Sequence, residues 1–356
     1  MEQNKRIVFT GGGTAGHVTP NVALIRRLLD EGWDVHYIGT EGGMERGLIG
    51  RIEGVKYHCI SAGKLRRYFS WQNFTDAFRV VKGLGQARRL VRELKPDVIF
   101  SKGGYVSLPV VMAAGKTPVV AHESDITPGL ANRIAGRFAN HICVSFEDTL
   151  KGLPQTKAVF TGAPIRTELY GGDKARARAM TGFSGQKPVL LAMGGSLGAQ
   201  RPNELLREAL PYLLPRYDIV HLCGKGKCQE DLCVDGYVQY EYIGEELPDL
   251  FALADVVLSR AGANAVFELL ALKKPALLIP LSKSSTRGDQ LRNAAYFENK
   301  GYALTMHQDG ATAERLTALL DELYERREDF IRAMERETRA DGTEGILALI
   351  RRVAGA

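Results

Sequence analysis

The stretch IVFTGGGTAGH at residues 7–17 decides the fold class, and VLLAMGGSLG at residues 189–198 repeats its plan. In each, a short apolar strand runs into a glycine-rich turn, and an amphipathic helix follows from about Asn21 or Asn203. Glycine has no Cβ, so backbone N–H groups can approach a diphosphate, and the following helix presents its positive dipole end to that charge. Two copies predict two mononucleotide-type domains that face one cleft.

Size and composition also suit a two-domain enzyme. The 356 residues are 45% hydrophobic and 25% charged, and a chain of this length exceeds one ordinary hydrophobic core. The formal net charge of +6 favours anionic partners such as phosphorylated sugars, acidic lipid surfaces or nucleic acid. Charge alone does not choose among these classes.

The N-terminus and the apolar runs indicate a chain that stays in the cytosol. Residues 1–6 are polar and a strand follows at once, which leaves no room for a signal peptide. The longest apolar candidate, residues 269–281, is interrupted by Lys273, Lys274 and Pro275, whereas a spanning helix needs ~18 to 20 apolar residues. Five cysteines without a framework spacing agree with a reducing compartment.

Three of these cysteines, Cys223, Cys228 and Cys233, follow His221 closely and raise the question of a zinc site. Their spacing lacks the tight C-x2-C knuckle of zinc ribbons. His221 and Cys223 alternate along an apparent strand, so a strand end followed by a variable loop is the favoured interpretation.

Alternating strand and helix patterns along both halves predict doubly wound α/β domains. The strands are short, rich in Val and Ile and continuous, as parallel strands covered on both faces should be. In the first half we expect strands at 7–10, 34–39, 56–60, 97–100, 118–121, 140–144 and 157–159, and helices at 19–31, 43–50, 73–94, 107–114, 127–138 and 146–151. In the second half we expect strands at 188–192, 217–223, 237–243, 255–258, 275–279 and 302–304, and helices at 201–215, 247–253, 262–271, 288–299 and 311–335.

The boundary between the domains is predicted near Pro164. TGAP at residues 161–164 and the polar stretch that continues to Lys187 are typical of a hinge. We therefore assign residues 1–164 to the first domain and 165–341 to the second. A last short helix follows Gly342, and we expect residues 342–356 to pack back on the first domain.

Polar residues gather where the predicted strands end, which is where open α/β sheets bind ligands. The clusters are His17, KGGY at 102–105, HESD at 122–125, the turn at 194–198, RAGAN at 260–264, Glu268, and Asp289 with Gln290. His122 could equally be a hydrogen-bonded core histidine, and Glu123 could support a neighbouring loop. Glu268 lies near the start of an otherwise apolar helix, a position that suits a ribose diol.

Seven motifs follow one another along nearly the whole chain: GGGTAGHVTP, SKGGYVSLP, AHES, TGAPIR, GGSLGAQRPN, RAGANAVFE and DQLRNA. In their order and spacing the chain resembles the MurG family of peptidoglycan glycosyltransferases. The resemblance implies the GT-B fold: α/β, with two Rossmann-like, doubly wound parallel-sheet domains facing a deep cleft. It also implies transfer, with inversion, of N-acetylglucosamine from UDP-N-acetylglucosamine to the 4-hydroxyl of undecaprenyl-diphospho-N-acetylmuramoyl-pentapeptide (lipid I), which gives lipid II.

The resemblance places the donor site mainly in the second domain. It implies that Ser196 binds the UDP phosphates, Ile243 the uracil and Glu268 the ribose hydroxyls. The remaining donor-side residues are the helix start at Ala263, Asn264, Ala265 and Val266 for a phosphate, Gln290 with Asp289 and Asn293 for the donor sugar, and Arg166 for the nucleotide.

In the first domain the resemblance implies that Thr14, Ala15 and Gly16 line the sugar and the acceptor diphosphate. Tyr105 and His122 would edge the acceptor pocket. The family pattern has HEQN where this chain has HESD, so Asp125 puts a potential negative charge near the donor sugar. The first loop also departs from the usual GGTGGH at Ala15, and both changes bear on specificity.

The chemistry predicts a base and no metal. The attacking hydroxyl needs a proton acceptor within hydrogen-bond reach, and an imidazole suits that task. His17 is the favoured base and Glu123 the reserve. The sequence has no Asp-x-Asp to clamp a diphosphate through a metal, and a helix N-terminus can stabilise the leaving UDP instead. We therefore expect no metal and no other cofactor.

Residues 64–74 combine cations with large aromatics, the composition of an interfacial patch on anionic lipid. Alternatively, Phe69, Trp71 and Phe74 pack on the core of the first domain. The expected partners are UDP-N-acetylglucosamine, the undecaprenyl-linked lipid acceptor and an anionic membrane surface, with no nucleic acid. The expected location is peripheral, at the cytoplasmic face of the cell membrane.

Three other functions fit parts of the pattern. A related GT-B enzyme would use another lipid acceptor, such as a diacylglycerol. A UDP-N-acetylglucosamine 2-epimerase would form UDP-N-acetylmannosamine without any acceptor. A non-catalytic sensor would bind UDP-N-acetylglucosamine and neither hydrolyse nor transfer it.

Overall fold

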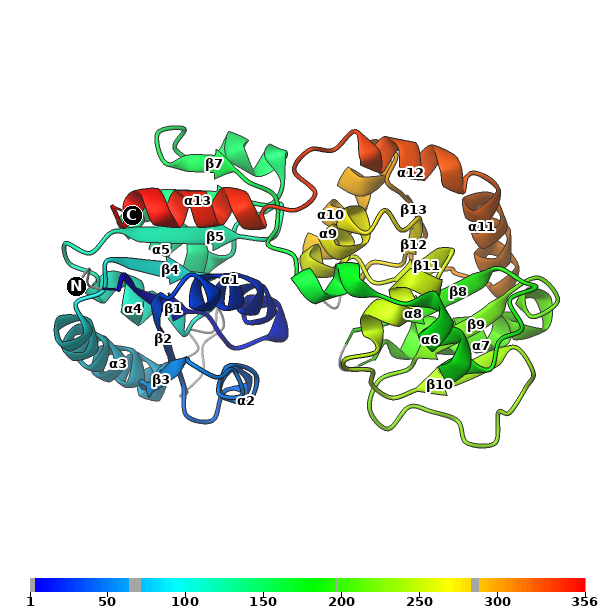
Figure 1. Cartoon of the computed structure of the whole chain (residues 1–356), viewed down its shortest axis with the longest axis horizontal. Coiled ribbons are helices and arrows are strands. Elements are labelled where there is room, and N and C mark those ends of the chain that lie inside the picture. The colour runs from blue at the N-terminus through cyan, green and yellow to red at the C-terminus, as the bar shows by residue number, and fades with distance from the viewer. Residues whose placement is uncertain (1–3, 64–71, 196–197, 283–287, 356) are drawn as a thin grey trace. The chain divides into compact units, whose positions relative to one another are not determined.

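The computed structural model describes residues 4–63, 72–195, 198–282 and 288–355, which form two compact units (Figure 1). The first unit runs to Arg166 and takes in the chain from Asp341 onward, whereas Thr167–Ala340 form the second. Each unit is built around one parallel sheet. The predicted α/β class, with two Rossmann-like parallel-sheet domains, is confirmed.

The first unit contains a seven-stranded parallel sheet in the order β3-β2-β1-β4-β5-β6-β7. Its strands are β1 Arg6–Thr10, β2 Asp34–Gly39, β3 Lys56–Cys59, β4 Val98–Ser101, β5 Val119–Glu123, β6 His141–Val144 and β7 Ala158–Phe160. The register puts Thr10 beside Ile38 on one side and Ser101 on the other. The strand order reverses between β1 and β4, the place where open sheets of this kind bind ligands.

Alternate residues of the central strands face two apolar layers. Ile7 and Phe9 point to one layer and Val8 to the other, and all three side chains are fully buried. The first layer includes α1 (Thr19–Asp30), and the second includes α3 (Gln72–Leu94), α4 (Ser107–Ala113) and α5 (Leu130–Phe138). The short elements α2 (Met44–Ile49), η1 (Ala15–His17) and η2 (Glu147–Gly152) complete the unit.

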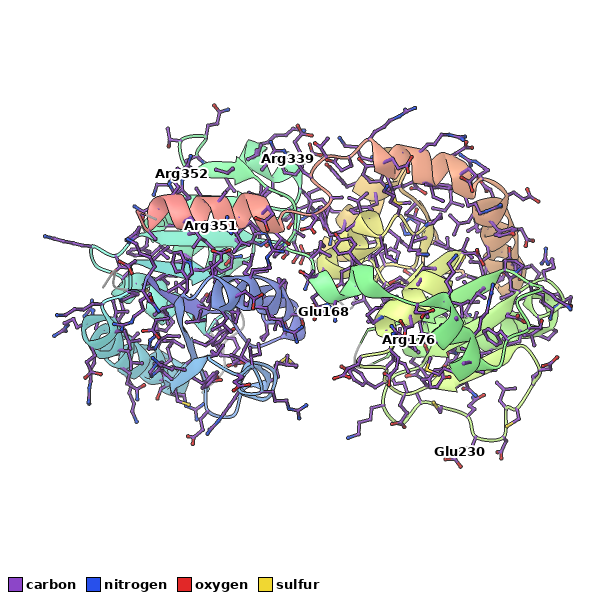
Figure 2. All side chains as sticks on the ribbon, viewed as in Figure 1. Glu168, Arg176, Glu230, Arg339, Arg351 and Arg352 are labelled. Atoms are coloured by element: carbon purple, nitrogen blue, oxygen red, sulfur yellow. The ribbon has the colours of Figure 1, made fainter. Side chains whose placement is uncertain are left out.

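The C-terminal helix α13 (Thr343–Val353) belongs to the first unit, although the sequence between it and that unit forms the second. Ile346, Leu347 and Ile350 are fully buried in the same layer as Ile7 and Phe9. Arg351, labelled in Figure 2, donates from Nε to Glu31 at 3.0 Å. The helix therefore closes one face of the β1 sheet.

The second unit contains a six-stranded parallel sheet in the order β10-β9-β8-β11-β12-β13. Its strands are β8 Val189–Met193, β9 Asp218–Leu222, β10 Tyr237–Tyr240, β11 Val256–Ser259, β12 Ala276–Leu278 and β13 Ala303–Thr305. Its helices are α6 Lys174–Thr181, α7 Gln200–Leu213, α8 Leu247–Leu253, α9 Ala263–Ala271, α10 Asp289–Asn299, α11 Ala313–Glu325 and α12 Arg327–Glu335, with η3 at Thr167–Gly171.

Three predicted elements need correction. The polar stretch between Pro164 and Lys187 is not all hinge, because it contains η3 and α6. Asp173 caps α6 by accepting from the N–H of Ala175 at 2.7 Å, and Gly182 ends it at φ 74°. The single helix expected over 311–335 is two helices that meet at Arg326. The helix expected at 146–151 is a 3₁₀ helix.

Among the residues that the structure describes, no helix combines the length and apolar character needed to cross a bilayer. The segment predicted to contact the membrane lies outside the described residues at 64–71, and so do the side chains of residues 72–74.

Candidate active site

The first glycine loop, residues 11–17, leaves the carboxyl end of β1 at the reversal of strand order. Close packing explains its glycines. A Cβ built on Gly13, whose φ is +86°, would lie 2.5 Å from Cε1 of Tyr105, and one on Gly11 would lie 2.5 Å from the carbonyl oxygen of His17. Glycine at these two positions therefore permits the close packing of the loop.

His17 lies half-exposed at the end of this loop. Its Nδ1 is 2.8 Å from Oγ1 of Thr14, and its N–H donates to the carbonyl of Thr14 at 3.1 Å. When Nδ1–H donates to the Thr14 hydroxyl, the lone pair of the imidazole is on Nε2, which can then accept a proton. Gly16 is exposed beside them.

A buried carboxylate that the sequence reading missed lies beneath the same loop. Glu45 is fully buried, and its Oε1 accepts from the N–H and hydroxyl of Thr40 at 3.0 and 2.6 Å. Its Oε2 accepts from the N–H of Gly13 at 3.4 Å. The sequence offered one sign of this carboxylate. Glu45 follows the end of a strand and the pair Gly42 and Gly43, as the other polar clusters follow strand ends.

His122 is fully buried, as the core-histidine interpretation expects. Its Nδ1 lies 2.8 Å from Nζ of Lys102, and its Nε2 lies 3.3 Å from the carbonyl oxygen of Gly162. Burial, and then the charge of Lys102, hold its pKa well below the usual range. The imidazole is therefore neutral, with its proton on Nε2.

Glu123 uses both carboxylate oxygens inside the protein. Oε1 accepts from the N–H of Asp125 at 3.0 Å, and Oε2 accepts from the N–H of Gly129 at 3.0 Å and from Nδ2 of Asn132 at 2.8 Å. Burial raises its pKa, although these donors oppose the shift. This geometry favours a loop-supporting role for Glu123.

In the second unit, the glycine loop leaves β8 and leads into α7. Gly195 and Gly198 have φ values of +84° and +68°, and a Cβ on Gly198 would lie 2.1 Å from the carbonyl oxygen of Cys223. Asn203 is buried in α7 and donates to that same oxygen at 2.8 Å. Ser196, predicted to bind phosphate, lies outside the described residues.

The start of α9 lies next to the end of β11, as predicted. Gly262 precedes the helix with an extended backbone, and Ala263 is its first residue. The first N–H groups of an α-helix point out of its end and attract anions; here they belong to Ala263, Asn264 and Ala265. Glu268 is half-buried one turn further on, and Val266 is buried.

Arg260 lies between β11 and this helix start. Its Nη1 donates to the carbonyl of Ile279 at 3.0 Å, and burial lowers its pKa. The sequence reading included Arg260 in a strand-end cluster without giving it a role. A half-buried guanidinium and a helix N-terminus that lie side by side can both attract the negative charge of a diphosphate.

The residues predicted to contact the donor sugar divide into two kinds. Asn293 is fully buried and donates from Nδ2 to the carbonyl of Ala261 at 3.1 Å, so it supports the loop before α9. Gln290 accepts from the N–H of Leu281 at 3.0 Å. Its amide nitrogen lies near Gly262, at the start of α9, because a Cβ built on that glycine would be 4.0 Å from it. Asp289 is half-buried at the start of α10.

The remaining predicted residues lie at loop positions. Ile243 is half-buried shortly after β10, and its neighbour Tyr242 is 73% exposed. Arg166 is half-buried at the last position of the first unit before the chain enters the second. Asp125 is half-buried in the turn that Glu123 supports.

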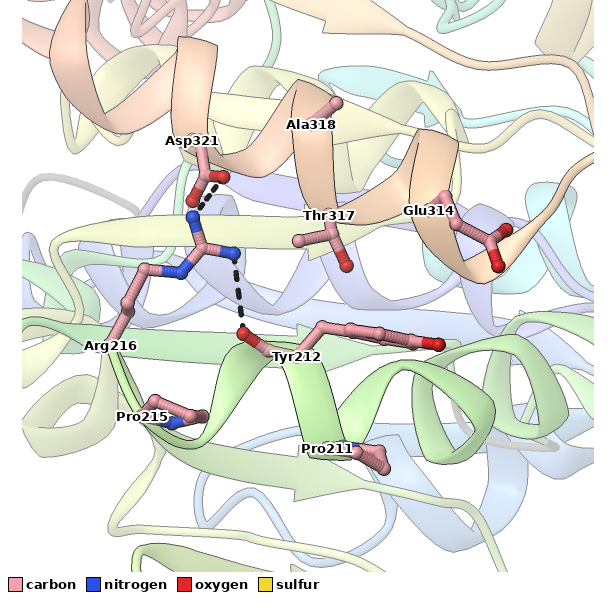
Figure 3. A pocket seen from close by; sticks show the side chains of 8 residues that line it. All are labelled: Pro211, Tyr212, Pro215, Arg216, Glu314, Thr317, Ala318 and Asp321. Carbon is pink, nitrogen blue, oxygen red and sulfur yellow. Dashed lines mark hydrogen bonds and ion pairs between the residues drawn. The ribbon is translucent and has the colours of Figure 1, made fainter.

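An open groove of about 410 Å³ between α7 and α11 contains none of the predicted site residues (Figure 3). Tyr212, Pro211 and Pro215 form one side of it, and Arg216 pairs with Asp321 across it. The strand ends described above, rather than this groove, carry the polar groups that suit a nucleotide sugar.

Within the described part of the chain, no cluster of three or more His, Cys, Asp or Glu residues could hold a metal ion. His221, which the sequence placed near three cysteines, has both ring nitrogens engaged. Nδ1 is 2.8 Å from the Tyr237 hydroxyl, and Nε2 is 3.1 Å from Oδ1 of Asn203. Cys223, Cys228 and Cys233 are free thiols.

Comparisons with known proteins cover both units. The glycosyltransferase family 28 N-terminal domain matches residues 7–144, and the family 28 C-terminal domain matches residues 189–348. A Geobacillus thermodenitrificans protein named UDP-N-acetylglucosamine–N-acetylmuramyl-(pentapeptide) pyrophosphoryl-undecaprenol N-acetylglucosamine transferase is 54% identical over 98% of this chain and 99% of its own. A Bacillus cereus protein with the same name followed by the number 2 is 50% identical over 99% and 100%.

Two solved structures extend the comparison. The structure of Acinetobacter baumannii MurG matches with a TM-score of 0.78 and 26% identity, over 98% of this chain and 99% of that one. The structure of a protein titled putative UDP-N-acetylglucosamine 2-epimerase, from Listeria monocytogenes, matches with a TM-score of 0.70, over 98% of this chain and 96% of that one. At 12% identity, the second match concerns the fold alone.

Proposed function

This chain belongs to the MurG family within glycosyltransferase family 28, and from that premise we propose that it makes lipid II. It transfers N-acetylglucosamine from UDP-N-acetylglucosamine to the 4-hydroxyl of undecaprenyl-diphospho-N-acetylmuramoyl-pentapeptide, with inversion, in peptidoglycan synthesis. The observation that carries the proposal is identity of about half over essentially full length with transferases of that name.

The donor binds mainly to the second unit in this proposal. Leaving UDP carries extra negative charge, which the N–H groups at the start of α9 and the Arg260 guanidinium are placed to stabilise. Glu268 accepts hydrogen bonds from the ribose diol, and the backbone at Ile243 reads the uracil. Ser196 contacts a phosphate, Gln290 and Asp289 the donor sugar, and Arg166 the nucleotide.

Asn293 acts through the backbone instead of touching the sugar. Its amide holds the carbonyl of Ala261 at 3.1 Å, directly before the helix start that faces the phosphate. Its replacement would therefore misplace Gly262 and Ala263 without removing a ligand contact.

His17 is the proposed general base. Its Nε2 takes the proton of the acceptor 4-hydroxyl as that oxygen attacks the anomeric carbon, and the bond from that carbon to the UDP oxygen breaks on the opposite face. Thr14 orients the ring from Nδ1 at 2.8 Å. Thr14, Ala15 and Gly16 line the sugar and the acceptor diphosphate, beside Tyr105.

The lipid-linked acceptor requires contact with a membrane surface. We propose that residues 64–74, with their mixture of cations and large aromatics, bind anionic lipid at the cytoplasmic face of the cell membrane. Sedimentation with vesicles that contain or lack anionic lipid tests this contact. Equal binding to neutral and anionic vesicles would contradict an electrostatic component.

The function is tested by UDP release with UDP-N-acetylglucosamine and a lipid I analogue, together with mass analysis of the product. The expected product is the acceptor plus one N-acetylglucosamine. His17→Gln should lower kcat by about 10²-fold or more, as loss of a general base does. The matched control His141→Gln changes a half-exposed histidine at the start of β6 and should transfer normally.

Other outcomes identify the rival functions. UDP release only with a diacylglycerol acceptor would reassign the substrate. UDP-N-acetylmannosamine formed without acceptor would indicate an epimerase, and donor binding with no turnover would indicate a sensor. Each of these results would overturn lipid II synthesis.

A further inference from the structure

Lys102 is a fully buried lysine at the carboxyl end of the first sheet. It follows the last residue of β4, and its side chain is 1% exposed. Lysine is almost never fully buried unless it is paired. Its backbone N–H donates to the carbonyl of Thr10 at 2.9 Å, so it continues the pairing of β4 with β1.

The ammonium group of Lys102 bonds to the strand and loop next to it. Nζ donates to Nδ1 of His122 at 2.8 Å and to Oγ of Ser124. The ionisable groups around it are His122, Glu123 and Asp125 on β5 and its following loop, and the buried thiol of Cys143 on β6. Burial lowers the pKa of Lys102 to about 8, and the two carboxylates oppose that shift.

The surroundings of Lys102 connect it to two loops of the proposed site, the Asp125 turn and the loop that carries His17. Ser124 precedes the turn that Glu123 clamps through Asp125 and Gly129. On the other side, a Cβ on Gly103 would lie 2.2 Å from Oδ1 of Asn132, and one on Gly104 would lie 2.3 Å from the carbonyl oxygen of Gly12. The turn that contains Lys102 therefore fits between the Asp125 turn and the loop that carries His17.

We propose that Lys102 is a positioning residue for the proposed transfer reaction. Its ammonium group compensates the negative charge that Asp125 brings to the sugar-facing turn, and it holds that turn in register with the His17 loop through His122 and Ser124. The inference rests on the proposed function for its kinetic consequences. Within HESD, the Ser124 hydroxyl accepts from this buried ammonium group, which ties the turn that carries Asp125 to the end of β4.

The test is a double-mutant cycle. Lys102→Met removes the charge and both hydrogen bonds while keeping an unbranched side chain. It should lower kcat/KM for transfer at least 30-fold, because Asp125 is left uncompensated and the turn shifts. Asp125→Asn should cost less than 5-fold. The double variant should recover at least 5-fold over Lys102→Met, since the carboxylate that needed the cation is gone.

Two further variants separate positioning from general stability. Lys274→Met is the matched control, because Lys274 is a largely buried lysine of the second unit, also with a pKa of about 8, that donates to the carbonyl of Ala254 at 2.8 Å. It should lower the unfolding midpoint and leave kcat/KM within 2-fold. Ser124→Ala removes one bond to the ammonium, keeps the charge, and should cost 3- to 10-fold.

The imidazole of His122 gives a readout that does not depend on turnover. In the wild type, NMR should show a neutral ring with its proton on Nε2 from pH 8 down to pH 5. Lys102→Met removes the donor that lies 2.8 Å from Nδ1 of His122, so the Nδ1 resonance of this variant should shift relative to the wild type. If Lys102→Met does not fold, the Ser124→Ala kinetics and the wild-type spectrum carry the test.

The outcomes distinguish the two proposals. A wild type that does not transfer to lipid I refutes the proposed function, whereas the His122 spectra still test the positioning role. Strictly additive effects of Lys102→Met and Asp125→Asn, or an unchanged His122 spectrum in Lys102→Met, would overturn the role of Lys102. Kinetics of Ser124→Ala equal to those of the wild type would also count against it.

Discussion

Replacement of Gly104 by alanine should impair transfer through the His17 loop, without a direct change at His17. Gly104 has φ +82°, and a Cβ there would lie 2.3 Å from the carbonyl oxygen of Gly12 and 3.4 Å from Nδ1 of His17. Cβ contacts below 3.0 Å are essentially never seen. The added Cβ and the Gly12 oxygen must therefore move apart by at least 0.7 Å, from 2.3 Å to 3.0 Å.

The matched control is Gly115→Ala in the same unit. Gly115 also has positive φ, at +62°, and a Cβ there meets nothing within 4 Å. Both variants carry the left-handed backbone cost of about 1–2 kcal/mol, which should appear as a similar loss of unfolding free energy in urea. Only Gly104→Ala adds the displacement of Gly12, and a misplacement of about 1 Å can cost about 10²-fold in rate.

The assay is UDP release with the lipid I analogue, beside urea unfolding of both variants. We expect kcat/KM of Gly104→Ala to fall about 10²-fold, which corresponds to about 2.7 kcal/mol, and that of Gly115→Ala to stay within 3-fold of wild type. If Gly104→Ala transfers as well as Gly115→Ala, the close contact of Gly104 with the His17 loop does not position the base, and the reasoning fails.

Three further predictions follow from the same geometry. Thr14→Val should lower kcat more than it changes the KM for UDP-N-acetylglucosamine, because the partner of His17 Nδ1 at 2.8 Å is lost. An unchanged kcat would count against Thr14 as the orienting group. Glu268→Gln should raise the KM for UDP-N-acetylglucosamine about 10-fold with little change in kcat, as loss of one uniform binding contact does, and a selective fall in kcat would contradict a ribose role. Burial lowers the pKa values of His36 and His58, and a nitrogen of one ring lies 2.8 Å from a nitrogen of the other. As pH falls, these histidines become protonated in the unfolded chain before they do so in the folded protein. The free energy of unfolding should therefore fall as pH drops below about 6.5. Urea midpoints at pH 7.5 and 5.5 check this, and His58→Gln should show a smaller difference between them than the wild type.

The elements that could be predicted from sequence are those fixed by local chemistry. The strands and their glycine turns depend on continuous apolar runs and on positive φ at Gly13, Gly195 and Gly198, which few other residues tolerate. The α6 helix was missed because its residues are mostly polar or small and give no apolar pattern. The signs of a helix in this sequence are the N-cap residue Asp173 and the C-terminal Gly182. Whether the last helix returns to the first domain depends on contacts such as those of Ile350 with apolar residues more than 200 positions earlier in the chain.

The roles of individual polar residues were harder to predict, because they depend on which strands are neighbours. Lys102 and His122 are 20 residues apart in sequence and meet because β4 pairs with β5, with Ser101 beside Ala121. Glu123, by contrast, binds Gly129 and Asn132 in the segment that directly follows β5. A sequence motif such as HESD locates a strand end, but only the partners show which side chains support the loop and which can face a ligand.

The two glycine loops differ in the charge behind them, and this difference bears on which one faces the nucleotide. The first loop has the buried Glu45 carboxylate beneath it, which occupies the Gly13 N–H at 3.4 Å. A diphosphate at that N–H would lose a donor and approach a negative charge. The second unit instead combines its loop with the α9 start and the Arg260 cation. These charges agree with the proposal that the nucleotide diphosphate binds in the second unit. In that proposal the acceptor lies against the part of the first loop from Thr14 to His17.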